Sequence, residues 1–200
     1  MQKQVEDTAM ALDRVDTVVA GVEPGDLTPV EEEAARAALR EALKAGYAKL
    51  QAGASAVDAV TAAISVLEDA PQFNAGRGAV FTHDGRNELD TSLMDGASGK
   101  AGAAAGLRRV KNPILLARAI MDKSVHVMMA GDGAEIFAKS QGIELVDPAY
   151  FRVEKRWQQL QKALKDEAKA QASNTPARHW KLPCGQATHN CLRASRHWMR

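Results

Sequence analysis

The chain has 200 residues, of which 46% are hydrophobic and 26% are charged, and its formal net charge is +1. This composition is typical of a globular domain with its own core, and it gives no reason to expect nucleic acid or an acidic membrane as a partner. Apolar runs are only a few residues long, so none spans a bilayer. The N-terminal residues MQKQVEDTAMALDRVD lack the apolar segment of a secretory signal, which predicts a cytoplasmic protein.

The first half of the chain contains two predicted helices. Residues 1–27 are weakly patterned, with a short strand expected at Val15–Val22. Thr28-Pro29-Val30-Glu31 then supplies an N-cap, a proline at the first helical position and a capping-box glutamate, which predicts a helix to about residue 50. Gly53 ends it. A second helix, over residues 55–67, begins with a serine and an aspartate at capping-box spacing.

A glycine-punctuated loop and a strand-turn-strand pattern follow. The loop is Phe73-Asn74-Ala75-Gly76-Arg77-Gly78, and its glycines indicate unusual dihedrals or close packing. Residues 79–82 are extended by composition, residues 83–86 carry an Asp-Gly turn signal, and residues 87–94 continue extended. Residues 100–107 suit a buried strand or a close-packed segment between helices.

The second half alternates helical and extended patterns. A helix is predicted from Asn112-Pro113 to about residue 123, a strand at 126–130, a turn at 131–133, and a helix at 134–140. Asp147-Pro148 then caps a long polar helix over residues 149–172, with Trp157, Leu160 and Leu164 as its docking face. The alternation predicts an α+β or layered α/β domain.

The C-terminal tail has a different character. We divide the chain into an altered N-terminal segment (1–27), a central domain (28–172) and an unrelated tail (173–200). The tail contains both cysteines, so a disulfide there would not define the redox compartment. It also contains residue types that bind zinc, at a spacing that matches no standard zinc site: His179, Cys184, His189, Cys191 and His197.

The segment from Leu67 to Gly96 resembles the plant-type L-asparaginase and isoaspartyl (β-aspartyl) peptidase family, which are threonine-type N-terminal nucleophile (Ntn) hydrolases. Phe-Asn-Ala-Gly-Arg-Gly is followed by Glu-Leu-Asp and then by Met-Asp-Gly. The resemblance runs from about residue 27 to about residue 164, which corresponds to most of the family's α-subunit and to none of its β-subunit. It implies half of a four-layer α-β-β-α sandwich and activity on L-asparagine and β-aspartyl dipeptides.

The nucleophile that the resemblance implies is a threonine released by autoproteolysis after a glycine. Its own α-amine can then act as the base that activates the hydroxyl. None of the eight threonines of this chain follows a glycine, and the His-Gly-Gly-Ala-Gly motif that begins family members is absent. We therefore expect a chain truncated before the catalytic threonine and inactive by itself.

Two groups of site residues follow from the resemblance. Asn74 would hydrogen-bond near the nucleophile, the alternative being an asparagine that only stabilises its loop. No cofactor is implied apart from a structural sodium ion, for which backbone carbonyls are suitable ligands; the alternative is an ordered loop without an ion. The carbonyls that match the family's sodium loop belong to Leu67, Glu68, Ala70, Phe73, Ala75 and Arg77.

Other candidate sites are less well supported. The glycine loop precedes a strand rather than opening a helix, which argues against a phosphate site. Glu88 and Asp90 share a strand face, and with Asp95 they are more typical of a solvated or hydrogen-bonded edge than of a catalytic pair. His126 is interpreted as a core or strand-end histidine.

Two alternatives to the enzyme remain open at this point. The first is a non-catalytic α-subunit-like binding protein that needs a partner chain, either a β-subunit or further copies of itself, because the absent half would normally cover part of its apolar core. The second, within the enzyme class, is a relative of glycosylasparaginase.

Overall fold

The computed structural model describes residues 27–172. Residues 25–161 form one compact unit, and of a second unit only residues 162–172 fall in the described range. The predicted strand Val15–Val22 and the tail with its candidate zinc ligands lie outside the described residues.

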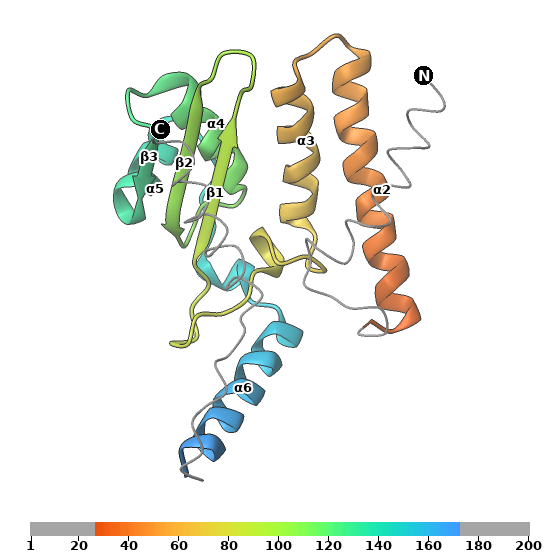
Figure 1. The fold of residues 1–200 in the computed structure, drawn as a ribbon, viewed down its shortest axis with the longest axis vertical. Coiled ribbons are helices and arrows are strands. Elements are labelled where there is room, and N and C mark those ends of the chain that lie inside the picture. Colours follow the sequence, from red (N-terminus) through yellow and green to blue (C-terminus); the bar gives the residue numbers. More distant parts are fainter. Residues whose placement is uncertain (1–26, 173–200) are drawn as a thin grey trace, which may run out of the picture. The chain divides into compact units, whose positions relative to one another are not determined.

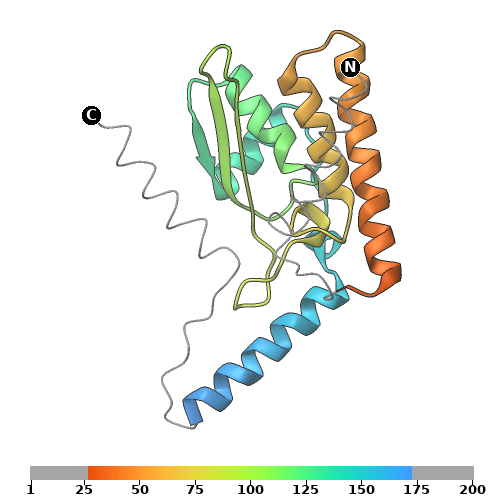
Figure 2. The same ribbon diagram turned by 45° about the vertical axis from the view of Figure 1, so that its right-hand side comes forward.

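Helices α2 (Pro29–Gln51) and α3 (Ala56–Asp69) confirm the two predicted helices and lie side by side (Figures 1 and 2). Both have complete capping boxes, at Thr28 and at Ser55. In the first box the Thr28 N–H donates to Oε2 of Glu31 at 2.8 Å, while Oε1 of the same carboxylate accepts from Nζ of Lys155 at 2.7 Å. One side chain thus caps α2 and also joins it to a segment far along the chain.

The sheet has three strands in the order β1-β2-β3, namely β1 (Leu89–Met94), β2 (Ala101–Leu107) and β3 (Met128–Ala130). Strands β1 and β2 form an antiparallel hairpin, and β2 pairs with β3 in parallel. The connection between the parallel strands contains helix α4 (Pro113–Lys123), as a crossover requires. Together with the helices, this small sheet establishes a mixed α+β structure.

Three boundaries differ from the sequence prediction. Residues 79–87 contain only an isolated bridge between Phe81 and Asn87, and the true hairpin turn is at residues 95–100, because β1 finds its ladder partner in β2. Helix α5 (Gly131–Ser140) begins within the predicted turn. Asp147 caps a short 3-10 turn, η2 (Pro148–Phe151), rather than the long helix, and the extended backbone of Arg152 delays the start of α6 (Glu154–Ala172).

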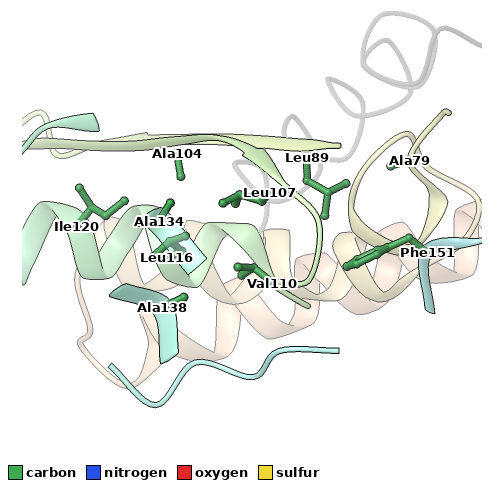
Figure 3. Packing of buried hydrophobic residues seen from close by; sticks show 10 residues of the cluster. All are labelled: Ala79, Leu89, Ala104, Leu107, Val110, Leu116, Ile120, Ala134, Ala138 and Phe151. Carbon is green, nitrogen blue, oxygen red and sulfur yellow. The ribbon is translucent and has the colours of Figure 1, made fainter. Parts of the chain in front are cut away.

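The main core lies between one face of the sheet and helices α4 and α5. Leu107 of β2, Leu116 and Ile120 of α4 and Phe151 of η2 are completely buried there. Figure 3 shows these side chains with the alanines that let the elements approach closely, including Ala134 and Ala138 of α5.

The opposite face of the sheet is not covered by any described helix (Figure 1). Strand residues that point there are exposed, among them Met94 at 66% and Met128 at 60%. Ala101, Ala103 and Ala105 of β2 are only partly buried. None of the helices in residues 27–172 is long and apolar enough to cross a membrane.

Candidate active-site loop

The loop over residues 73–78 is packed tightly on the end of α3, and its glycines are required for this. A Cβ atom on Gly76, whose φ is 48°, would lie 2.3 Å from the carbonyl oxygen of Glu68. A Cβ atom on Gly78 would lie 2.0 Å from the carbonyl oxygen of Phe73 and 2.8 Å from that of Pro71. These distances exclude any larger residue at either position, which explains the spacing of the glycines.

Asn74 is exposed and fixes the loop through its side chain. Its Oδ1 accepts a hydrogen bond from the backbone N–H of Val80 at 2.9 Å. Across the turn, Nδ2 of Asn87 donates to the carbonyls of Ala79 at 2.9 Å and Val80 at 3.2 Å. The loop-stabilising role of Asn74 is therefore present in the structure, and its contact within residues 27–172 uses the acceptor end of the amide.

The start of α6 holds the loop from the other side. Nε of Arg156 donates to the carbonyl of Gly78 at 3.0 Å. The ring of Trp157 meets Phe81 edge to face, with centroids 5.3 Å apart, and lies beneath Gly85. Trp157 therefore packs, as its predicted docking role requires, against the segment that follows Asn74.

The predicted sodium ligands all lie in this loop and the adjacent end of α3. The backbone carbonyls of Leu67, Ala70 and Ala75 each accept one backbone hydrogen bond, from Ala70, Phe73 and Gly78 respectively. A carbonyl oxygen has a second lone pair, so this leaves capacity for a ligand. No group of three or more His, Cys, Asp or Glu side chains in residues 27–172 is placed to hold a metal. The oxygens of this predicted set are neutral, the kind of donor that suits a hard cation.

Glu68 links this loop to helix α4, a role that the sequence interpretation missed. The side chain is 4% exposed, and Oε1 accepts from the N–H of Ile114, in the first turn of α4, at 2.9 Å. Oε2 is buried without a hydrogen-bond partner among the described residues. Burial raises the pKa of Glu68 from its ordinary 4.5 to about 7, although the Ile114 N–H works in the opposite direction. No short-range pattern connects two residues so far apart in sequence.

We expect the Glu68 carboxyl to make stability depend on pH in the neutral range. Because its pKa is raised on folding, its contribution is complete below pH 4.5 and is lost as the pH rises towards 7. Wild type should therefore lose about 2 kcal/mol of unfolding free energy between about pH 5 and about pH 7, relative to Glu68→Gln. Urea unfolding of both proteins in buffers of fixed ionic composition measures this. The prediction is contradicted if the unfolding free energy of wild type minus that of Glu68→Gln stays constant or increases as the pH rises.

The three acidic residues of the β1 region make separate structural contacts. Glu88 pairs with Arg108 at 3.0 Å, and Oδ1 of Asp90 accepts from the N–H of Gly106 at 2.9 Å. Asp95 accepts from residues 97 and 98 of the hairpin turn, and these hydrogen bonds lower its pKa. His126 is exposed and lies just before β3.

Comparison with known proteins assigns the loop and its surroundings to a family. The family model described as asparaginase matches residues 15–190. The chain is 50% identical over 131 residues to an isoaspartyl peptidase of Escherichia coli, a match that covers 66% of this chain and 41% of that protein.

Archaeal and animal relatives give the same result. A plant-type L-asparaginase of Pyrococcus abyssi is 46% identical over 144 residues, covering 72% of this chain and 44% of the relative. An isoaspartyl peptidase/L-asparaginase of Mus musculus is 40% identical over 159 residues, covering 80% and 48%. The chain thus spans less than half the length of these curated relatives. It belongs to the asparaginase family that includes plant-type L-asparaginases and isoaspartyl peptidases.

Proposed function

We propose that this chain is the α-subunit-like part of a threonine-type hydrolase that acts on L-asparagine and β-aspartyl dipeptides. The observation that carries the proposal is the loop at residues 73–78, where glycine packing fixes Asn74 at the surface beside a tight turn. The names of the relatives, isoaspartyl peptidase and plant-type L-asparaginase, support the substrate class.

The role proposed for Asn74 uses the donor end of its amide. Its oxygen is engaged by the Val80 N–H, which orients the side chain without involving the Nδ2 hydrogens in that bond. An oriented N–H donor can stabilise the negative charge that develops on the substrate oxygen when an amide is attacked. In this proposal Asn74 supports catalysis, and the nucleophile is a threonine that these 200 residues do not contain.

A further half of the fold, on the same or on a separate polypeptide, is part of the proposal because these 200 residues contain no Gly-Thr pair. Without a threonine that a glycine precedes, the chain has no residue matching the nucleophile that the family uses. The exposed face of the β1-β2-β3 sheet supports such a partner, since a second sheet packed on it would bury Met94 and Met128 and complete an α-β-β-α sandwich. A non-catalytic binding protein with the same partner is the second candidate, favoured by the same exposed face.

The loop is also proposed to hold a sodium ion through the backbone carbonyls of the six residues named above. Two of these carbonyls, those of Glu68 and Phe73, lie directly against Gly76 and Gly78. The chain's own contribution is to fix the loop, through the glycines and through Arg156, which donates to the Gly78 carbonyl.

The test is aspartate release from L-asparagine and from a β-aspartyl dipeptide. We expect none from the 200-residue chain alone. We expect release when it is co-produced with the C-terminal portion of a related isoaspartyl peptidase that begins at its threonine. Release by the chain alone would overturn the proposed need for a partner nucleophile, and a stable complex without release would favour the binding protein.

A matched variant tests Asn74 in the active complex. Asn74→Asp keeps an oxygen for the Val80 N–H but removes the amide donor, so the loop should stay folded. Loss of one such donor is expected to reduce turnover by about a hundredfold. If the complex carrying Asn74→Asp forms normally and keeps full activity, Asn74 has only its structural role.

A further inference from the structure

Three Asp-Gly pairs occur in the chain, Asp84-Gly85, Asp95-Gly96 and Asp132-Gly133, and the structure places them in different environments. An aspartate followed by glycine can rearrange spontaneously, because glycine has no Cβ to obstruct the approach of its amide nitrogen to the aspartate side chain. Whether it does so depends on how freely that side chain and the peptide bond after it can move.

Asp84 is placed where little restrains it. Its side chain is 78% exposed, and its Oδ1 lies 3.7 Å from Nδ1 of His83, which is also exposed. The turn is closed by two backbone hydrogen bonds, from Gly85 to Thr82 at 2.9 Å and from Thr82 to Arg86 at 2.7 Å. The Arg86 N–H also donates to the Thr82 hydroxyl at 3.2 Å, and the turn adjoins an isolated bridge rather than a strand ladder, so opening it breaks fewer interactions than opening a strand pair.

The other two pairs are held by their surroundings. Asp95 accepts from the N–H groups of Ala97 at 3.1 Å and Ser98 at 3.3 Å and from the Ser98 hydroxyl at 2.5 Å, so three hydrogen bonds hold its carboxylate in place. Asp132 and Gly133 are in the first turn of α5, where the helix fixes the rotation about the Cα–C bond that ring closure must change.

We propose that Asp84 is a site of spontaneous isoaspartate formation in the folded protein. The amide nitrogen of Gly85 bonds to Cγ of Asp84, and one side-chain oxygen leaves as water with the amide proton and a second proton, which closes a succinimide ring. A water molecule then adds to the ring carbonyl that was the main-chain carbonyl of Asp84, and its bond to nitrogen breaks. The chain now continues through Cβ and Cγ, with no net change in mass and one oxygen taken from solvent.

The modification would act on the loop described above. A backbone through the side chain is one methylene longer between residues 84 and 85, at the point where Gly85 rests on Trp157. A Cβ atom on Gly85 would lie 3.3 Å from that ring, so there is little space for displacement towards it. Isoaspartate at position 84 should therefore loosen the contact between the turn and α6.

The experiment is to incubate the full chain in water enriched in oxygen-18, at physiological temperature and neutral pH, and to map the label by mass spectrometry of peptides. Fragmentation that distinguishes aspartate from isoaspartate identifies the product. We expect the Asp84 peptide to gain isotope and isoaspartate about tenfold faster than the Asp95 and Asp132 peptides, because only its turn opens at low cost. In urea the three peptides should label at similar rates.

The variant Asp84→Glu serves as the control. It keeps the charge and exposure, but its side chain would have to close a larger and slower-forming ring, so label should disappear from that peptide alone. Equal labelling of the three sites in the folded chain, or no labelling of Asp84 under conditions in which the urea sample labels, would overturn the proposal.

Discussion

Replacing Gly102 by alanine is expected to lower the free energy of unfolding by about 3 kcal/mol. Gly102 is in β2, where α4 crosses the sheet, and a Cβ atom there would lie 2.1 Å from the carbonyl oxygen of Ala117 and 2.6 Å from the nitrogen of Met121. Both are backbone atoms of the helix, so no side-chain rotation relieves the overlap. Helix α4 would have to move away from the sheet and open the core that Leu116 and Ile120 fill.

Gly96→Ala is the matched control for this measurement. It adds the same methyl group in the neighbouring hairpin turn, where no atom lies within 4 Å of the new Cβ. Its effect on urea unfolding should stay within about 0.5 kcal/mol, the range of ordinary surface substitutions. Equal effects of the two substitutions would show that α4 does not pack on β2 as described.

Glu135→Leu is expected to cost about 3 kcal/mol, because it leaves several hydrogen-bond donors without an acceptor. Glu135 of α5 is 3% exposed. Its Oε1 accepts from the N–H groups of Arg108 at 2.7 Å and Arg109 at 2.8 Å, and Oε2 accepts from Nε of Arg109 at 2.8 Å. Glu135→Gln keeps one acceptor oxygen and should lose clearly less stability than the leucine variant.

The same carboxylate should contribute to acid denaturation. Burial raises the pKa of Glu135, but its bonds to Arg108 and Arg109 outweigh this and hold the pKa below the ordinary 4.5. Its contribution is therefore present above pH 4.5 and is lost as the pH falls through the folded-state pKa. Glu88→Gln, which removes an exposed pair with Arg108, is the control and should change stability several times less. If the two glutamine variants are equally stable at neutral pH, the buried contacts of Glu135 are not as described.

Local signals in the sequence predicted where α2, α3 and α4 start, although not where α5 and α6 start. The Thr28 and Ser55 capping boxes each depend on residues three positions apart, so the starts of α2 and α3 could be predicted from sequence, and Gly53 ends α2 with a φ of 77°. The start of α4 was predicted from Asn112-Pro113, where the proline occupies the first turn but the Asn112 side chain makes no capping hydrogen bond. The glycines of the loop also predicted close packing, but the sequence did not indicate which carbonyls the loop packs against.

Strand pairing and side-chain contacts between residues far apart in sequence could not be predicted from local signals. The Asp84-Gly85 turn has the sequence of a hairpin turn, but β1 pairs with β2, and this preference depends on the packing of β2 against α4. The contacts of Glu68 with Ile114 and of Glu135 with Arg108 join positions 46 and 27 residues apart, and no periodicity links them. The buried carboxyl beside the candidate site was therefore found only in the folded chain.

The shared carboxylate of Glu31 has a consequence for the entropy of the contact between α2 and α6. An exposed ion pair usually contributes little because two long side chains must both lose rotational freedom to form it. Here the Thr28 N–H and hydroxyl already orient Glu31 through Oε2, so Lys155 meets a carboxylate whose conformation is fixed before they come together. Only the lysine loses rotational freedom when the pair forms. The local capping residues of α2 therefore lower the entropic cost of joining this helix to the first turn of α6.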